Sequence, residues 1–498
     1  LLDGEQALGG CGMRMDPPTA YVFPEAYDRI VVVKGPQTVL HGPGNSAASV
    51  SFERDVRRFD ETGYTAYASA LGASASRSDL VGDLRFGTPS VYGELTGTRA
   101  ESDDYEDGAG TTVHSQYERW SASGALGWTP DDATLVELSG IRSDGEAAYA
   151  DRAMDGVAFD RDNVGLRYER SDTTGRLRGV EAQAYYNYVD HVMDNYSLRD
   201  FTPTPTMPGR TVQNPDRRTT GGRAAFELAW SGGTVATLGA DLQQNEHSLR
   251  ATMNQLAMPY ESLPRTDDAW FRSIGTFGEV NHPLPARNRL VAGLRLDAWE
   301  ARDERQALRV GMAMVPNPTA DETRRTTLPS GFVRLEHGLA GRPATLFAGL
   351  GHVQRFPDYW ELVSAGKESV DGLSAFDTAP EKTTQLDTGV VYAGAKLSAS
   401  VSAFYSDVDD YILIQSGYPK GMRSTTVTRN IDARTWGGEA DATYAFTARW
   451  KLTGTLAYTH GENRTDGLPL AQMPPLELRT GLDYTGRQWS AGALWRVV

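Results

Sequence analysis

The sequence of 498 residues contains a single cysteine, Cys11, and it lacks long apolar runs. One cysteine excludes an internal disulfide bond. Because no stretch reaches about 18 apolar residues, no transmembrane helix is predicted. Lysine is scarce beside arginine, and the net charge is −16. This acidic balance argues against a nucleic-acid partner, whose phosphates need a basic face, and it fits a surface that attracts cations.

Signals for export and for enzymatic chemistry are also absent from the sequence. The chain opens on Leu1-Leu2-Asp3-Gly4 without a basic segment, so no signal peptide is predicted and we expect a mature or trimmed chain. There is no Ser/His/Asp arrangement, no phosphate-binding loop and no pair of carboxylates with a pocket. We therefore expect a protein that is not an enzyme.

From about residue 60 onward, apolar and polar residues alternate with a period of two. In one such segment Leu290, Leu294 and Leu296 fall on one face, and Arg295 and Asp297 fall on the other. Segments of about ten alternating residues with Tyr and Trp near their ends are typical of a transmembrane β-barrel. A soluble β-sandwich is the alternative, but it accounts poorly for the number of strands and needs no aromatic girdles.

The connections between these segments alternate between short and long. Short turns are expected at 88–90, 129–132, 171–174, 231–233, 338–341, 393–395, 447–449 and 485–487, and long loops at 101–114, 143–160, 191–217, 247–270, 301–325, 355–381, 407–427 and 461–474. Bacterial outer-membrane barrels have short periplasmic turns and long outer loops, and their sheet closes because lipid offers no partner to a free edge. We predict about nineteen strands. Since such barrels normally have an even number, the last strands are expected to be missing.

Residues 1–56 follow a different pattern. Residues 29–33 form a short apolar strand, and Pro36 is placed for the first turn of a helix. We therefore expect one or two helical turns over 37–41 and a second strand over 47–52. The result is a small α+β unit that is too short to hold a good core alone.

The single cysteine stands in a segment rich in soft metal ligands. Cys11, Met13 and Met15 precede two prolines, and His191 and Met193 form the one His-x-Met pair of the chain. A thiolate, thioethers and an imidazole suit Cu(I) far better than the oxygen-seeking ions. The alternative is that the cysteine is a small buried apolar residue and the methionines fill the core.

The segment Ile30–Asn45, IVVVKGPQTVLHGPGN, resembles the plug of TonB-dependent outer-membrane receptors. Three later pieces, at 355–362, 380–386 and 436–439, resemble barrel signatures of the same family. The resemblance implies an all-β transmembrane barrel of twenty-two strands with an N-terminal α+β plug in its lumen. Residues 1–56 would be the C-terminal part of the plug, and residues 57–498 the barrel without its last strands. It also implies a bacterial outer-membrane location, contact with outer-membrane lipid and lipopolysaccharide, and coupling to the TonB complex of the inner membrane.

The geometry of such a barrel would bring the two ligand pairs together. If the first strand rises from the periplasm, the strand over 177–189 rises too, and its alternate residues separate into two faces. Val180, Ala182, Ala184, Tyr186 and Tyr188 would face lipid, and Glu181, Gln183, Asn187, His191 and Met193 would face the lumen. A plug loop carrying Cys11 and Met15, shaped as a helical turn or a tight loop ended by proline, could meet them there. A free thiol in an oxidising compartment also needs a reason to survive, and metal ligation supplies one.

Within the family, Cys-x-x-x-Met in the plug with His-x-Met in the barrel resembles the copper receptors of the OprC/NosA type. This resemblance implies that Cys11, Met15, His191 and Met193 bind copper, with Cu(I) favoured and Ag(I) possible, for import into the periplasm. Two alternatives remain open: a receptor for an iron–siderophore or other metal chelate, and a passive porin or surface docking protein. The other histidines show no ligand spacing. Loop methionines that could pass soft ions inward are Met253, Met258, Met312, Met314 and Met422.

Overall fold

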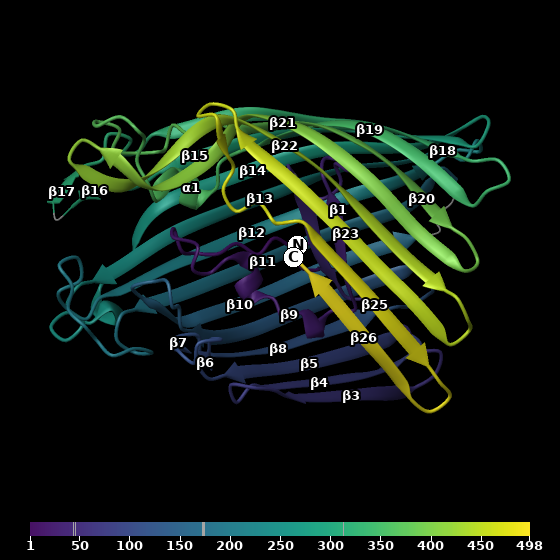
Figure 1. Cartoon of the computed structure of the whole chain (residues 1–498), viewed down its shortest axis with the longest axis horizontal. Helices are drawn as coiled ribbons and strands as arrows, with labels where there is room; N and C mark the ends of the chain where they lie inside the picture. Colours follow the sequence, from purple (N-terminus) through teal and green to yellow (C-terminus); the bar gives the residue numbers. More distant parts are fainter. Residues whose placement is uncertain (43, 45, 172–174, 312) are drawn as a thin grey trace.

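The computed structural model describes residues 1–42, 44, 46–171, 175–311 and 313–498. The strands form one closed antiparallel barrel, and the N-terminal segment lies inside it (Figure 1). Most of the expected turn at 171–174, two residues of the plug-like motif (Pro43 and Asn45) and Met312 lie outside the described residues. Among the described residues, no helix has the length and apolar character needed to cross a membrane.

Nineteen long strands and one two-residue strand make up the described barrel. They are β3 (Gly63–Gly72), β4 (Ser78–Thr88), β5 (Val91–Ser102), β8 (Tyr117–Trp128), β9 (Thr134–Ala147), β10 (Asp155–Ser171), β11 (Leu177–Asp194), β12 (Val212–Ala229), β13 (Val235–Thr252), β14 (Thr266–Leu284), β15 (Asn288–Asp303), β18 (Thr323–Gly338), β19 (Ala344–Arg355), β20 (Glu381–Ala393), β21 (Leu397–Lys420), β22 (Arg423–Ala445), β23 (Trp450–Asn463), β24 (Leu468–Pro469), β25 (Glu477–Thr485) and β26 (Ser490–Val497). The predicted fold class and strand count are therefore confirmed.

The two faces of the barrel wall differ as the sequence predicts. On β15, Leu294 and Leu296 are exposed, whereas Arg295 and Asp297 are buried against the interior. The outward aromatic residues near the short-turn ends of β22 to β26 form a continuous row, which runs through Tyr444, Phe446, Trp450, Tyr484 and Trp489. Such a row is typical of the aromatic girdle of an outer-membrane barrel.

Small elements fill the connections and the interior. They are η1 (Pro18–Tyr21), η2 (Pro24–Ala26), β1 (Arg29–Lys34), β2 (Ala48–Glu53), β6 (Tyr105–Glu106), β7 (Thr112–Val113), η3 (Tyr260–Ser262), β16 (Ala307–Val310), β17 (Ala313–Pro316) and α1 (Tyr359–Val363). Strands β1 and β2 pair as an antiparallel hairpin inside the barrel, as expected for residues 29–33 and 47–52. The boundary at residue 56 between plug and barrel stays a prediction.

The expected helix over residues 37–41 is wrong. The Thr38 hydroxyl and the Val39 N–H both donate to the Glu279 carboxylate on β14, and the Arg223 guanidinium on β12 donates to the Leu40 carbonyl. The polar groups of this segment thus form their hydrogen bonds with the barrel wall. The backbone can therefore stay irregular, because it does not need the hydrogen bonds of a helix. The same contacts fasten the N-terminal segment to the barrel.

The prediction that short and long connections alternate strictly is wrong at two places. The expected loop at 407–427 is mostly strand, because β21 and β22 continue to a connection of two residues, 421–422. Its β-branched residues explain this: Ile412 and Val427 are buried on the extended hairpin, where such side chains pack well. The connection at 73–77, between β3 and β4, is also short.

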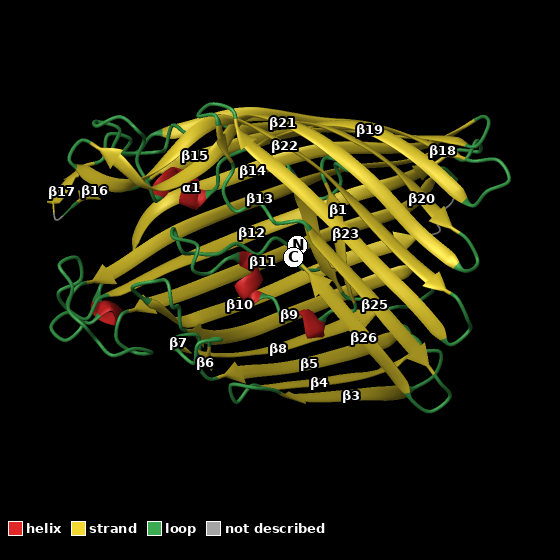
Figure 2. Ribbon diagram, in the orientation of Figure 1, coloured by secondary structure: helices red, strands yellow, loops and turns green. Residues whose placement is uncertain are grey.

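One outer connection carries α1, the only α-helix of the described residues; the other red segments in Figure 2 are the short 3-10 turns η1, η2 and η3. Helix α1 begins after Asp358, whose side chain accepts from the backbone of Glu361 while the Glu361 carboxylate accepts from the Asp358 N–H, a capping box. Its buried face, with Tyr359 and Leu362, packs with Phe376 of the same loop and with residues of β14, β15 and β18. This core holds α1 inward, over the N-terminal segment.

Candidate metal centre

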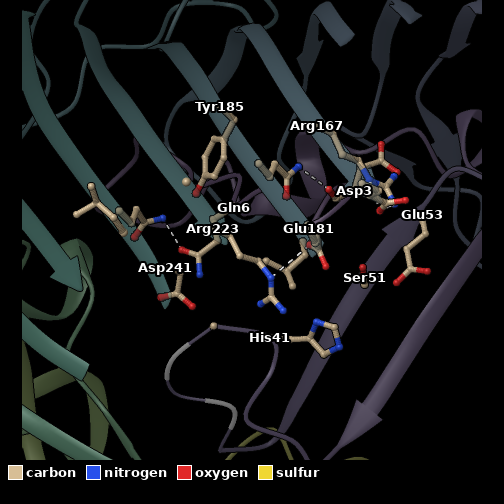
Figure 3. Close-up of a pocket in the computed structure, with 18 of the residues that line it drawn as sticks. Asp3, Gln6, His41, Ser51, Glu53, Arg167, Glu181, Tyr185, Arg223 and Asp241 are labelled. Carbon is tan, nitrogen blue, oxygen red and sulfur yellow. Dashed lines mark hydrogen bonds and ion pairs between the residues drawn. The ribbon is translucent and has the colours of Figure 1, made fainter. Parts of the chain in front are cut away.

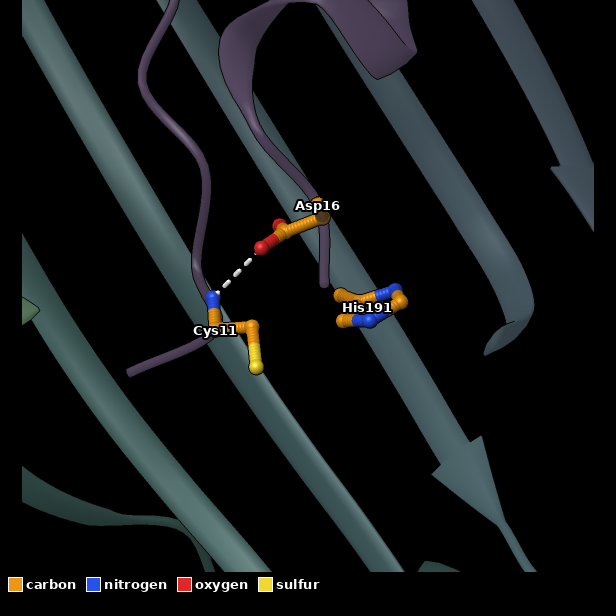
Figure 4. A group of neighbouring side chains, drawn as sticks. All are labelled: Cys11, Asp16 and His191. Atoms are coloured by element: carbon orange, nitrogen blue, oxygen red, sulfur yellow. Dashed lines mark hydrogen bonds between the residues drawn. The ribbon is translucent and has the colours of Figure 1, made fainter. Parts of the chain in front are cut away.

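The loop that carries Cys11 is a tight turn closed by one carboxylate. The Arg14 N–H donates to the Cys11 carbonyl at 3.0 Å, and Arg14 has a positive φ of 54°. The Asp16 carboxylate accepts from the Gly10 N–H, the Cys11 N–H and the Tyr21 hydroxyl, each at 2.7 Å. Figure 4 shows the bond from Asp16 to the Cys11 backbone. The segment is therefore the tight loop that the sequence allowed, and not a helical turn.

The second ligand pair lies at the end of β11, on its inner face. His191 and Met193 are almost fully buried, at 0% and 3% exposure, while Tyr186 on the same strand is exposed. The His191 Nδ1–H donates to the Ala158 carbonyl on β10 at 2.8 Å, and this contact selects the tautomer whose lone pair is on Nε2 when the ring is neutral. Within the described part of the chain, this buried Nε2 has no hydrogen-bond partner. A ring held by one nitrogen with the other available is typical of a metal-binding histidine.

The structure brings the two pairs together. The Cys11 thiol lies 3.4 Å from the Met193 sulfur, although the residues are 182 positions apart. Cys11, Met15 and Met193 form one buried cluster. The ligand atoms of Cys11, Asp16 and His191 all lie within 4.8 Å of one another. The four residues named from the sequence thus meet where the plug-like loop touches the barrel wall, and their role as ligands stays a prediction.

Two donor sets overlap at this place, and they favour different ions. Cys11, Asp16 and His191 offer sulfur, oxygen and nitrogen, whereas Met15 and Met193 add thioethers. The Asp16 carboxylate already accepts three hydrogen bonds within the loop. It therefore shapes the loop, and the remaining soft set suits Cu(I) rather than zinc, for which thioethers are poor ligands.

Burial, with the Asp16 carboxylate beside it, raises the pKa of Cys11 to about 11. The residue is therefore a protonated thiol at neutral pH as long as no metal binds. Its S–H donates to the Met193 sulfur, and the Met13 N–H donates to the Cys11 sulfur at 3.3 Å. Since the thiolate is the ligating form, metal binding here releases a proton.

Three neighbours of the cluster, Asp16, Tyr149 and Met154, were not predicted from the sequence. Tyr149 donates from its hydroxyl to the Met15 carbonyl at 2.7 Å, and both Tyr149 and Met154 pack against the sulfur cluster. Asp16 stands directly before the two prolines, and an Asp before proline in a turn is a signal for side-chain bonds to the backbone. Tyr149 and Met154 lie in a loop with no ligand spacing, so nothing in the sequence marked them.

Apart from Met154 and His247, the sulfur and imidazole groups described next lie outside this centre. Met13 points away and is 54% exposed. The loop residues Met258, Met314 and Met422 are also exposed. The barrel histidines other than His191 bond to protein groups or contact rings: His114 to Asp155, His247 to Asp268, His282 to Thr234, His337 to Asn288, His352 to Thr384, and His460 against Trp436. Among the described residues, Cys11, Asp16 and His191 are the one group with metal-ligand spacing.

A cavity of about 210 Å³ lies between the N-terminal segment and the barrel wall (Figure 3). Charged and polar side chains surround it, including Glu53, Glu181, Arg223 and Asp241. Five barrel strands, β10 to β14, line it together with β1 and β2. The lining residues of β11 lie between 181 and 185, whereas His191 stands nearer the other end of that strand. No cysteine or methionine is among its lining residues, so the soft-ligand chemistry belongs to the Cys11 cluster.

The substitution Gly9→Ala is expected to loosen the loop that carries Cys11, whereas Gly10→Ala is not. A Cβ at Gly9 would stand 2.0 Å from the Asp16 carbonyl oxygen, a backbone atom that cannot yield easily, whereas a Cβ at Gly10 meets nothing closer than 3.7 Å. Overpacking costs roughly 1–3 kcal/mol. Gly9→Ala should therefore raise the rate at which a thiol reagent labels Cys11 by at least about tenfold. Equal rates for Gly9→Ala and the matched Gly10→Ala would contradict this account of the loop.

Comparison with protein families gives one match that covers most of the chain. The family model described as TonB dependent receptor-like, beta-barrel, matches residues 97–498. Among curated proteins, an iron-regulated outer membrane virulence protein of Vibrio cholerae serotype O1 is 32% identical over 111 residues, which is 20% of this chain and 17% of that protein. The match therefore spans well under two thirds of that relative.

Solved structures resemble the whole chain. The copper transporter OprC is 48% identical with a TM-score of 0.95, over 100% of this chain and 78% of that one. The Serratia marcescens hemophore receptor HasR is 15% identical with a TM-score of 0.77, over 100% of this chain and 83% of that one. The Neisseria meningitidis FrpB iron transporter is 14% identical with a TM-score of 0.72, over 95% of this chain and 75% of that one. HasR and FrpB share the fold.

Proposed function

We propose, from the premise that the chain belongs to the TonB-dependent receptors of the outer membrane, that this protein captures copper and imports it into the periplasm. The copper would be its cargo, bound as Cu(I) by Cys11, Met15, His191 and Met193. TonB would drive release, as the family's dependence on TonB implies. The protein would act as a receptor and transporter, and not as an enzyme.

One observation carries the choice of copper. The Cys11 sulfur lies 3.4 Å from the Met193 sulfur, and His191, with an available Nε2, lies within ligand spacing of Cys11. Three sulfurs and one imidazole in a buried cluster favour Cu(I), and Ag(I) by the same chemistry. The likeness to a copper transporter that is 48% identical supports the proposal.

The burial of the cluster supports import rather than passive flow. Cys11, Met15, His191 and Met193 are all buried, with at most 7% of any one exposed, so a bound ion would be closed off from bulk water. Two ligands stand on the plug-like loop and two on the barrel wall. If the loop moved away from β11, the site would split into halves and its affinity would fall. A TonB-driven movement of the plug could thus release the ion.

Metal binding by the purified protein tests this function. We expect one Cu(I) per chain when the protein is loaded anaerobically and dialysed, with Ag(I) competing for the same site. Zn(II) at the same concentration should not displace Cu(I), since thioethers bind zinc poorly. Elemental analysis gives the stoichiometry, and competition with a chromophoric Cu(I) chelator gives the Kd. A protein that binds no Cu(I), or that binds a ferric siderophore in its place, would overturn the proposal.

A further inference from the structure

A histidine outside the ligand set touches the backbone next to Cys11. His247 on β13 is 1% exposed, and its Nε2–H donates to the Gly10 carbonyl at 2.5 Å. Its Nδ1–H donates to the Asp268 carboxylate on β14, also at 2.5 Å. Both partners are oxygen acceptors, so each ring nitrogen contacts a group that can only accept a hydrogen bond. His247 thus links two barrel strands to the loop that holds Cys11.

The contact of His247 acts on one peptide unit. The Gly10 carbonyl and the Cys11 N–H belong to the same planar peptide group. His247 holds its carbonyl end, and Asp16 holds its N–H end at 2.7 Å. The Arg14 N–H holds the next carbonyl, that of Cys11, at 3.0 Å, so the peptide planes on both sides of Cys11 are held and its Cα–Cβ bond has a set direction. The direction of the thiol therefore depends on a barrel side chain as well as on the loop itself.

The outer helix α1 reaches the same peptide through His247. The Tyr359 ring stacks on the His247 ring, with 3.6 Å between centroids and 20° between planes. The Tyr359 hydroxyl donates to the second oxygen of the Asp268 carboxylate at 2.6 Å. Arg217 adds a parallel link, because it donates to the Gly9 carbonyl at 3.2 Å and to Asp358 at 2.9 Å. The three residues His247, Asp268 and Tyr359 form a buried unit that we call the latch.

Two further contacts place α1 directly on the ligand loop. The Arg14 guanidinium lies 3.4 Å from the centroid of the Trp360 ring. A Cβ at Gly12 would stand 2.4 Å from the Ser364 hydroxyl oxygen, so the loop and the end of α1 are in close contact. The outer loop therefore covers the Cys11 turn, and the latch ties that cover to the peptide that orients the thiol.

We propose that His247 is a positioning residue for the metal centre. Through His247, the latch couples the position of the outer helix α1 to the direction of the Cys11 thiol. The inference rests on the proposed function, because it assigns this role to a site that binds Cu(I). When α1 is seated, Tyr359 holds Asp268 and the His247 ring, and the ring holds the Gly10 carbonyl. Displacement of α1 frees that carbonyl and lets Cys11 turn away from Met193.

The single cysteine makes the test specific. In His247→Ala without metal, a thiol reagent should label Cys11 about tenfold faster than in the wild type. The Cu(I) Kd should rise by roughly 10–100-fold, the usual effect of removing a group that orients a ligand. Tyr359→Phe keeps the stacked ring but loses the hydroxyl bond to Asp268, and it should shift both quantities in the same direction by a smaller factor. His337→Ala removes a barrel histidine that bonds Asn288 near the short-turn end, and it should change neither.

The two measurements separate the inference from the function on which it rests. Labelling is carried out on the protein without metal, so it reports the orientation of Cys11 whether or not copper binds. Wild-type protein that binds no Cu(I) would overturn the proposed function. Wild-type affinity for Cu(I) with unchanged labelling and unchanged Kd in His247→Ala and Tyr359→Phe would overturn the latch alone. Heat-modifiable migration of the barrel in a gel confirms that each variant is folded.

Discussion

Substitution of Cys11 by alanine is expected to abolish stoichiometric Cu(I) binding while the barrel stays folded. Cys11 supplies the one ligand of the proposed set that becomes an anion, since thioethers and a neutral imidazole carry no charge. Its sulfur also lies 3.4 Å from the Met193 sulfur, so its removal opens the centre of the cluster. We expect the Kd to rise by more than about 100-fold, beyond what outer-shell substitutions usually cost.

The sulfur chemistry of the loop offers a matched control. Met13 stands two residues from Cys11, is 54% exposed and lies outside the buried cluster. Met13→Ala removes a thioether from the same turn and should leave the Kd for Cu(I) unchanged. Competition with a chromophoric chelator measures both variants. If Cys11→Ala keeps one tightly bound Cu(I) per chain, the assigned centre is wrong, and the search for the copper site must move elsewhere.

The barrel strands could be predicted from the sequence because the alternation of apolar and polar residues is a pattern between near neighbours in the chain. Alternate residues of a strand face opposite sides, so Leu294 and Arg295 already separate lipid from interior in the sequence. Turns were harder. The connection at 285–287 was missed because Ala286 and Arg287 both adopt positive φ, at 60° and 64°, in a tight turn without the glycine or asparagine that usually marks one.

The metal centre could be predicted in part, because its ligand types are rare in this chain. With one cysteine and one His-x-Met pair, the sequence offers few combinations of soft ligands. The two-residue alternation of the strand then predicted that the His191 side chain points inward. The surroundings of the site could not be predicted in the same way. Contacts such as His247 to the Gly10 carbonyl, or Tyr149 to the Met15 carbonyl, join residues more than 130 positions apart. No local pattern encodes which polar side chain of the wall meets which carbonyl of the loop.

Replacement of Glu5 by glutamine is expected to stabilise the N-terminal segment inside the barrel above neutral pH. Glu5 is 6% exposed and accepts from the Asn163 amide at 2.7 Å. Burial raises the pKa of Glu5 from 4.5 to about 7, against the smaller opposing effects of Asn163 and Arg161. The folded chain therefore holds this proton more tightly than the unfolded chain. Its contribution to stability is full below pH 4.5 and is lost as the pH rises to about 7.

The shift in pKa sets the size of the effect. A rise in pKa from 4.5 to about 7 corresponds to about 3 kcal/mol at pH 8, and glutamine avoids this cost because it is neutral at every pH. Urea unfolding of the segment, followed by pulse labelling of Cys11, should show wild-type stability falling between pH 5 and 8 relative to Glu5→Gln. Groups that titrate in both proteins cancel in this difference. Glu25→Gln, an exposed carboxylate of the same segment, is the control and should follow the wild type. Coincident curves for the wild type and Glu5→Gln would mean that Glu5 already ionises freely in the folded protein.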